Sequence, residues 1–320
     1  MANSAPMHIV CAVDSAYARH CAVLLRSLRQ CHPDQRLEVT LLHVGLDPQE
    51  ALRLYADGQT QVDALSLIQV NPSLLASFPV DGHITPAAYL RLVLAEVLPP
   101  GLERVLYLDA DILVRAPLDA LWTLDLQGCV LAAVAAPNEP DNCWRLRLDP
   151  EQGYFNSGVL LIDLARYRSF GVYGKALQFV RSHPERIRWH DQDVLNHLFR
   201  DLWLPVSDSW NATTPWWLQS GDALRPDVDV RDPDRHLPFV PALIHFTGGG
   251  WYKPWNYLCL HPHRQGYRDL ARQTPWRHVP LLERPSLLQQ WRRRLRWSQR
   301  LHAALAHGPA RRFSGWALQR

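Results

Sequence analysis

Short apolar runs alternate with segments in which apolar residues recur every three or four positions along the first 136 residues. The runs predict strands and the periodic segments predict helices. The predicted strands cover 8–13, 37–44, 64–70, 104–114 and 130–136, and the predicted helices cover 18–31, 47–56, 85–98 and 118–124. Strands separated by helices pair in parallel through right-handed crossovers. We therefore predict an α/β protein with a single Rossmann-like, mostly parallel sheet flanked by helices.

The second half of the chain is less regular. A strand is predicted at 154–164, helical segments within 165–182 and at 191–200, and long loops rich in Pro, Trp and Asp from 203 to 241. Trp210, Trp216 and Trp217 in these loops either line a sugar site or fill a core, since tryptophan serves both purposes. We expect one catalytic domain over residues 1–283, followed by a tail at 284–320.

The tail differs from the rest of the chain in charge. It holds nine arginines and no acidic residue, so 25 of the 34 basic residues remain in residues 1–283 against all 31 acidic ones, a net charge of −6. Residues 287–305 have helical periodicity with a broad Leu/Trp face opposite most of the arginines. Such a helix either docks on an anionic membrane surface or packs on the enzyme. We expect the membrane surface to be its partner.

Composition narrows the class of protein. An acidic main domain argues against nucleic-acid binding. The six cysteines are far apart, as in a reduced cytosolic protein. Neither a secretory leader nor an apolar stretch of membrane-spanning length is evident. We expect a cytoplasmic protein, held peripherally on the inner leaflet of the cytoplasmic membrane by its tail.

The segment RVLYLDADILV places Asp109 and Asp111 at the end of a buried strand. Ligands of such sheets bind beyond the carboxyl ends of the strands. This acidic pair either holds a divalent cation or caps a turn. Two carboxylates and the imidazole of His245 would suit Mn²⁺ better than Ca²⁺, which prefers oxygen ligands alone.

The segment LIHFTGGGWYKPW adds a glycine run and a cation. Lys253 is one of two lysines in a chain with 32 arginines, which indicates a position that needs a compact charge. Glycines 248–250 would let backbone amides approach a phosphate. Alternatively, Lys253 is a surface cation in a loop and His245 is a core histidine.

Six segments in order resemble family 8 retaining glycosyltransferases: CAVDSAY, AAYLRL, VLYLDADILV, FNSGVLLIDL, DQDVLNHLF and HFTG…KPW. The resemblance spans residues 8 to 256, includes the lipopolysaccharide-core galactosyl- and glucosyltransferases, and extends distantly to glycogenin. It implies the glycosyltransferase A fold, a UDP-hexose donor, Mn²⁺ (or Mg²⁺) and a glycan or glycolipid acceptor.

The resemblance also implies roles for individual residues. The metal ligands are Asp109, Asp111 and His245. The catalytic residues are Gln192, Asp191 and Lys253. The donor-binding residues are Ala12, Asp14, Tyr17, His83, Arg91, Ala110, Asn156, Ser157 and Gly248. Because the Gln192 amide is a poor nucleophile, we favour attack by the acceptor from the face that the diphosphate leaves.

The chain departs from the family pattern in three places. It has two more residues between His245 and Lys253 than the usual HxxGxxKPW. Ala16 stands where relatives have Asn or Thr, and Ala136 where they often have an Asp that Glu139 or Asp141 would have to replace. Two other functions stay open: a nucleotide-sugar-binding protein without turnover, and a haloacid-dehalogenase-type phosphatase, whose Asp-x-Asp motif LYLDADILV resembles.

Overall fold

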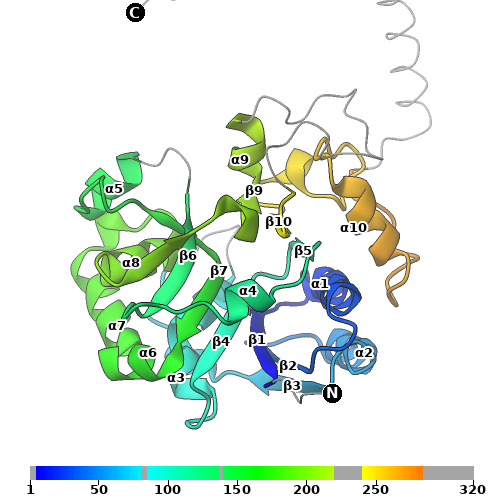
Figure 1. Cartoon of the computed structure of the whole chain (residues 1–320), viewed down its shortest axis with the longest axis horizontal. Helices are drawn as coiled ribbons and strands as arrows, with labels where there is room; N and C mark the ends of the chain where they lie inside the picture. The colour runs from blue at the N-terminus through cyan, green and yellow to red at the C-terminus, as the bar shows by residue number, and fades with distance from the viewer. Residues whose placement is uncertain (1–4, 81–84, 137–139, 220–239, 284–320) are drawn as a thin grey trace, which may run out of the picture.

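A seven-stranded sheet and a three-stranded sheet organise the chain in a computed structural model, which describes residues 5–80, 85–136, 140–219 and 240–283 (Figure 1). The large sheet has the order β3-β2-β1-β4-β7-β6-β8. Its strands are β1 (Met7–Ala12), β2 (Leu37–His43), β3 (Ala64–Gln69), β4 (Arg104–Leu108), β6 (Leu131–Ala135), β7 (Phe155–Asp163) and β8 (Trp203–Val206). Neighbouring strands are parallel except at β7, which is antiparallel to β4 and β6. The predicted mostly parallel sheet is confirmed.

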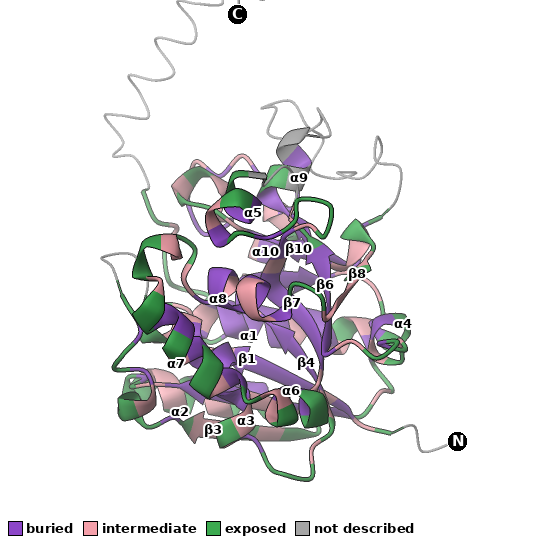
Figure 2. Cartoon of the chain, turned by 90° about the vertical axis from the view of Figure 1, so that its left-hand side faces the viewer, coloured by how far each residue is buried: buried purple, intermediate pink, exposed green. Residues whose placement is uncertain are grey.

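Helices cover both faces of this sheet. One face packs on α1 (Ala18–Cys31) and α2 (Pro48–Gly58); the other packs on η2 (Pro86–Val93), α3 (Leu94–Val97), α6 (Leu164–Phe170), α7 (Val172–Ser182) and α8 (His190–Phe199). Successive residues of a strand point to opposite faces. In β4, Val105 and Tyr107 accordingly join one core and Leu106 and Leu108 the other. The central strands are therefore mainly apolar and largely buried (Figure 2), whereas the edge strands β3 and β8 have no buried residue.

The small sheet lies beyond the end of β4 (Figure 1). It consists of β5 (Ile112–Val114), β10 (Leu243–His245) and β9 (Ala212–Thr213), in the order β5-β10-β9. A separate core joins it to α9 (Thr214–Gln219) and α10 (Arg264–Ala271), through Trp217, Phe246 and Tyr267. Trp217 is thus a core residue and not the floor of a sugar site. The residues between β4 and β5 are Asp109, Ala110 and Asp111, which therefore lie where the two sheets meet.

Three predicted elements differ from the structure. The strand expected at 104–114 is two strands in different sheets, because the polar pair interrupts the apolar run. The helix expected at 85–98 is mainly a 3₁₀ helix that begins with a proline. The helical segment 165–182 is broken at Gly171, whose φ of +70° ends α6 in the left-handed region that glycine favours.

Several short elements come from segments without a clear periodic signal. They are α5 (Pro140–Leu146) and the 3₁₀ turns η1 (Pro72–Leu74), η3 (Pro184–Arg186), η4 (Asp208–Trp210) and η5 (Gly250–Tyr252). The helix predicted at 118–124 is confirmed as α4 (Asp119–Trp122). The stretch 203–241, predicted as loops, contains β8, β9 and α9. The tail at 284–320 lies outside the described residues. Within the described part of the chain, no helix has the length and apolar character needed to cross a bilayer.

Candidate functional site

The acidic pair and a histidine far away in the sequence face one another between the two sheets. β10 pairs antiparallel with β5, with His245 opposite Ile112, so the imidazole is placed beside the turn that carries both aspartates. His245 Nε2 lies 3.7 Å from Asp109 Oδ2 and 3.3 Å from Asp111 Oδ1. The ligand atoms of the three residues all lie within 4.8 Å of one another. The structure thus brings together the three metal ligands that the sequence predicts.

Each carboxylate directs one oxygen to this triangle and the other to a cation. Asp109 Oδ1 accepts hydrogen bonds from Arg91 Nη2 at 2.8 Å and from Tyr107 Oη at 3.1 Å. Asp111 Oδ2 accepts one from Lys253 Nζ at 2.5 Å. Burial works to raise the pKa of Asp111, but Lys253 and His245 outweigh it and hold the pKa below its usual value. Both carboxylates are therefore fixed in orientation with one oxygen available to a ligand.

The donor set fits a divalent cation. Two carboxylate oxygens and one imidazole nitrogen converge, a combination that suits Mn²⁺ and similar ions. Three protein ligands also leave coordination positions open for phosphate oxygens or water. We conclude that Asp109, Asp111 and His245 form a candidate divalent-metal site.

Gly158 lies so close to this site that any side chain at its position would collide with the site residues. A Cβ at this position would lie 2.2 Å from His245 Cε1 and 2.7 Å from Asp109 Oδ2, closer than real atoms approach. Its backbone carbonyl also accepts a hydrogen bond from the Asp109 N–H at 2.8 Å. Sequence reasoning did not select this residue, although glycine inside a strand often marks a close approach.

Asn211, which was also not selected from the sequence, determines the tautomer of His245. The Gly158 N–H donates to Asn156 Oδ1 at 3.0 Å, and that oxygen also accepts from Asn211 Nδ2 at 2.8 Å. Asn211 Oδ1 therefore faces His245 Nδ1, at 3.0 Å. Because this oxygen can only accept, Nδ1 carries the proton and the lone pair of Nε2 points to the aspartates, as a metal ligand requires.

Arg91 lies beneath the carboxylates and connects two of them. Its guanidinium contacts Asp109, donates from Nη1 to the Ser157 carbonyl (2.6 Å) and hydroxyl (2.8 Å), and brings Nε within 3.1 Å of Asp191 Oδ2. Burial opposes its charge, but Asp109 and Asp191 together raise the pKa of Arg91. Burial also raises the pKa of Asp191 to about 6, against the opposing effect of Arg91. The Ser157 hydroxyl donates to Asp191 at 2.9 Å.

Gln192 lies next to Asp191 in the first turn of α8. Its Oε1 accepts hydrogen bonds from Asn156 Nδ2 and from the Ser157 N–H, both at 3.0 Å. Hydrogen bonds thus join the start of α8 to the start of β7, directly before Gly158. The residues in this group are Asn156, Ser157, Asp191 and Gln192. The structure places all four predicted residues beside the candidate metal site.

Lys253 reaches the site despite the longer loop before it. Its ammonium bonds to Asp111 and to the Phe246 carbonyl, at 2.5 Å each, and lies 5.3 Å from the centre of the Trp255 ring. Burial works to lower its pKa, but Asp111 and other neighbours raise it above the usual value. Lys253 is therefore a partly buried cation of the site, with 12% of its side chain exposed, and not a free surface residue.

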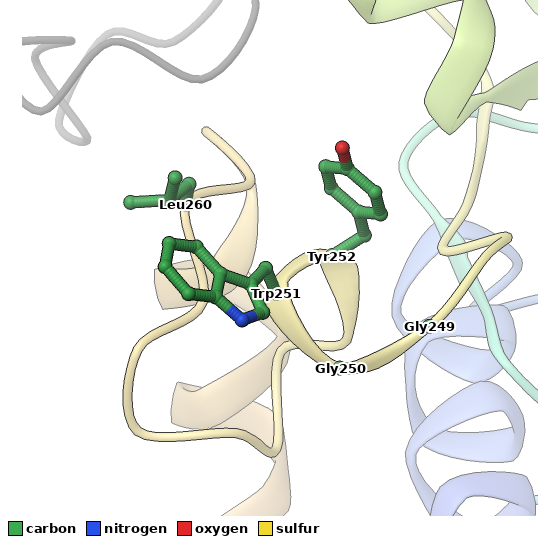
Figure 3. Close-up of a pocket in the computed structure, with 5 residues that line it drawn as sticks. All are labelled: Gly249, Gly250, Trp251, Tyr252 and Leu260. Carbon is green, nitrogen blue, oxygen red and sulfur yellow. The ribbon is translucent and has the colours of Figure 1, made fainter.

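The glycine loop encloses a small hollow outside this ion pair. Gly248 has a φ of +82°, after which the chain turns through η5. Figure 3 shows Trp251 and Tyr252 pointing apart from this turn, with Leu260 beside Trp251. Trp251 is 58% exposed. The extra residues of the loop therefore present aromatic surface to solvent without displacing Lys253.

The predicted nucleotide-binding residues follow β1. Asp14 accepts hydrogen bonds from the Tyr17 N–H at 3.0 Å and from Thr85 Oγ1 at 2.9 Å. The Tyr17 ring packs edge-on against Trp255 and lies 5.9 Å from Lys253 Nζ. Ala12 ends β1. This end of the site is thus connected to the metal end through Lys253.

The remaining predicted positions contribute less. Ala110 is buried between the two ligand aspartates, and Ala16 is exposed. His83 and Glu139 lie outside the described residues. Asp141 is exposed on α5, and Ala136 donates its backbone N–H to the Tyr154 carbonyl at 2.7 Å. Neither brings a carboxylate to the site.

Comparison with known proteins identifies the fold around this site. The galactosyltransferase LgtC, solved in complex with donor and acceptor sugar analogs, superposes with a TM-score of 0.75 at 28% identity, over 85% of this chain and 99% of LgtC. The glycosyltransferase A prediction is therefore confirmed. The structure adds a three-stranded sheet to the single sheet predicted.

Sequence comparisons agree. General stress protein A of Bacillus subtilis is 30% identical over 279 residues, 85% of this chain and 96% of the relative. Lipopolysaccharide 1,2-glucosyltransferase of Escherichia coli K12 is 30% identical over 248 residues, 73% and 71% of the two chains. A family model described as "Glycosyl transferase family 8" matches residues 8–259. The chain is a member of glycosyltransferase family 8.

Proposed function

We propose that this glycosyltransferase moves galactose or glucose from a UDP-hexose to a glycan or glycolipid acceptor, with retention of anomeric configuration and dependence on Mn²⁺. The observation that carries the proposal is the convergence of Asp109, Asp111 and His245 on one point, with Lys253 beside it. Four of the similar proteins are named as lipopolysaccharide glucosyl- or galactosyltransferases, which favours a lipopolysaccharide-core acceptor.

Asp109, Asp111 and His245 would hold the cation, which supplies positive charge to the diphosphate when bound. Lys253, which donates to the other oxygen of Asp111, would neutralise negative charge that develops on the leaving phosphate. Mg²⁺ is the alternative ion, because it also takes carboxylate oxygens, but the imidazole ligand favours Mn²⁺.

The remaining residues act on the sugar. Asp191, once ionised, accepts hydrogen bonds from sugar hydroxyls, and Gln192 lies beside the anomeric carbon. The bond from that carbon to the diphosphate breaks as the bond to the acceptor oxygen forms on the same face. The acceptor proton passes to the leaving phosphate oxygen. No covalent glycosyl-enzyme is needed, which agrees with the neutral amide of Gln192.

The test uses the purified protein with UDP-galactose and UDP-glucose, with Mn²⁺ or with EDTA. We expect UDP release that requires the metal and an acceptor, and a product whose anomeric proton coupling is that of the donor. Binding of UDP-hexose without release would instead support the non-catalytic alternative. Phosphate release from a simple ester would support the phosphatase. A glycosyl adduct on Asp191 or Gln192, detected by mass spectrometry, would contradict attack from the leaving-group face.

We further propose that residues 284–320 hold the enzyme on the anionic inner surface of the cytoplasmic membrane, where lipid-linked acceptors would be available. The support is the amphipathic pattern and the nine arginines of this segment, each contributing about 1 kcal/mol near such a surface. Flotation with anionic liposomes should carry the full chain and leave a chain truncated after Pro285 at the bottom of the gradient. Equal flotation of both would contradict this role.

A further inference from the structure

We infer that Tyr154 and Asp193 are positioning residues that hold the Gln192 amide in one orientation and leave an N–H of that amide as the group it presents to the sugar. The inference rests on the proposed function, because it assigns the orientation of a side chain in that reaction. Neither residue has a role in the steps described above. Both are buried, Asp193 completely.

The orientation of Gln192 follows from groups that can only donate. A side-chain amide can be turned by 180° with little change of shape, so its neighbours must distinguish oxygen from nitrogen. The Ser157 backbone N–H lies 3.0 Å from one end of the Gln192 amide, which must therefore be Oε1. The second donor to this oxygen, Asn156 Nδ2, is fixed in the same way, because the Gly158 N–H donates to Asn156 Oδ1.

The other end of the amide meets Tyr154. Gln192 Nε2 lies 3.0 Å from Tyr154 Oη, which must accept because the amide nitrogen only donates. The tyrosine proton then has to point elsewhere, and Asp193 Oδ1 lies 2.8 Å away to receive it. Burial, reinforced by Asp193, raises the pKa of Tyr154 well above its usual value, so the proton stays on the phenol.

Asp193 is itself anchored as an acceptor. Arg145 reaches both of its oxygens at 2.9 Å, and the backbone N–H groups of Arg188 and Trp189 donate to Oδ2 at 2.6 and 2.5 Å. A carboxylate held by these donors accepts the Tyr154 proton in every arrangement. In the hydrogen bonds that link Asp193, Tyr154 and Gln192, only one assignment of donors and acceptors is therefore possible.

This arrangement decides what Gln192 offers to a ligand. Both acceptor positions of Oε1 are used, and one N–H of Nε2 is donated to Tyr154. Among the described residues, the second N–H of Nε2 has no partner. Gln192 therefore meets the donor sugar as a hydrogen-bond donor, fitted to a hydroxyl or ring oxygen. Tyr154 keeps the plane of the amide fixed while it does so.

The first test is Tyr154→Phe, which removes only the hydroxyl. We expect kcat for sugar transfer to fall about 10- to 100-fold, with Mn²⁺ affinity unchanged, because a misplaced group costs rate more than binding. Tyr173→Phe is the matched control, since its hydroxyl donates to the Leu74 carbonyl away from the site at 3.0 Å. The control should keep wild-type kcat.

A double-mutant cycle separates positioning from general damage. In a Gln192→Ala background, Tyr154→Phe should cause no further loss of kcat, because its target is already absent. An equal loss in both backgrounds, or an unchanged kcat in the single variant, would overturn the inference. Turnover by the wild type tests the proposed function separately.

A second measurement does not depend on turnover. The ¹⁵N side-chain amide signals of Gln192 are identified by their absence in Gln192→Ala. In Tyr154→Phe they should move and their protons should exchange faster with water, whereas Tyr173→Phe should leave them in place. Unmoved signals in Tyr154→Phe would overturn the inference even if the enzyme has no measurable turnover.

Discussion

Two glycine segments border the site, and they differ in how tightly they are packed. At Gly158, a Cβ would fall 2.2 Å from His245 Cε1, so β7 leaves no space for a side chain beside this candidate metal ligand. At Gly249, in the loop before Lys253, a Cβ would meet nothing within 4 Å. Two residues further, Trp251 projects into solvent (Figure 3).

The tightly packed segment borders the candidate metal site, whereas the open segment presents a surface that could contact a ligand. The metal end is built from strands of two sheets and a carboxylate pair whose oxygens are all assigned to partners or to the ligand position. The loop end has space, and it is there that the chain carries two residues more than the family pattern. Lys253 still reaches Asp111. The loop can therefore change length and surface without altering the charges around the candidate metal site.

The largest expected effect on activity comes from adding a methyl group at Gly158, in the tightly packed one of the two glycine segments. Gly158→Ala should lower kcat/KM for sugar transfer by about 100-fold or more, because His245 and Asp109 must move away from the added methyl group. Overpacking of this kind also costs about 1–3 kcal/mol of folding free energy. Mn²⁺ affinity, measured by calorimetry, should fall together with activity.

Gly249→Ala is the matched control for that variant. Gly249 has a φ of −92°, which alanine adopts readily, and it has open space around its Cα. We expect kcat/KM within about twofold of the wild type. If both alanine variants lose activity to the same extent, the contrast between the two segments is wrong.

The second prediction concerns the residue behind His245. Asn211→Ala removes the acceptor for the Nδ1 proton and should weaken Mn²⁺ binding about 10-fold, since such outer partners set the tautomer of a metal-binding imidazole. Asn211→Asp keeps an acceptor at this position and should retain affinity within about threefold of the wild type. Equal weakening in both variants would show that His245 does not depend on this hydrogen bond.

The sequence predicted one side of this contrast better than the other. The central strands of the large sheet were recognisable because both of their faces are buried, which makes them nearly continuous apolar runs, whereas the edge strand β8, with no buried residue, was predicted as a loop. Asp109 and Asp111 stood out because they interrupt such a run. His245 and Lys253 followed from residue type and from resemblance, and the structure places both beside the acidic pair.

The supporting residues were not predictable in the same way. Asn211 occurs in a stretch of Trp and Asp without periodicity, and only the pairing of β9 with β10 brings it to His245. Tyr154 lies 39 positions before Asp193, and no local pattern connects them. Gly158 carries a signal, as a glycine inside a strand, but its meaning depends on a side chain from the other sheet. Contacts between distant segments determine these roles.

The third prediction is that kcat/KM depends on pH through Asp191, the residue proposed to bind the sugar hydroxyls. Asp191 has a pKa of about 6, raised by burial, and must be ionised to accept hydrogen bonds from sugar hydroxyls. We expect kcat/KM to be full above this value and to fall about tenfold per pH unit below it. The profile is measured at two Mn²⁺ concentrations, because protons and a metal ion compete for metal ligands, so that effect depends on the metal concentration, whereas the titration of Asp191 does not. If the acidic part of the kcat/KM profile shifts entirely with Mn²⁺ concentration, the loss of activity is due to the metal ligands and not to Asp191.

The smallest expected effect lies on the open side. Trp251 presents an exposed ring next to the hollow lined by Gly249, Gly250 and Leu260, a surface on which the apolar face of an acceptor sugar can stack. Trp251→Ala should raise KM for the acceptor about 2- to 10-fold, which corresponds to the ~0.5–1.5 kcal/mol of an aromatic contact. KM for the donor should not change, because the Trp251 ring is exposed to solvent, whereas Lys253 is held by Asp111 and the Phe246 carbonyl. Trp144, 67% exposed on α5, provides the matched control. If Trp144→Ala raises the acceptor KM equally, or if Trp251→Ala raises the donor KM instead, the loop does not contribute to acceptor recognition and its additional length has another cause.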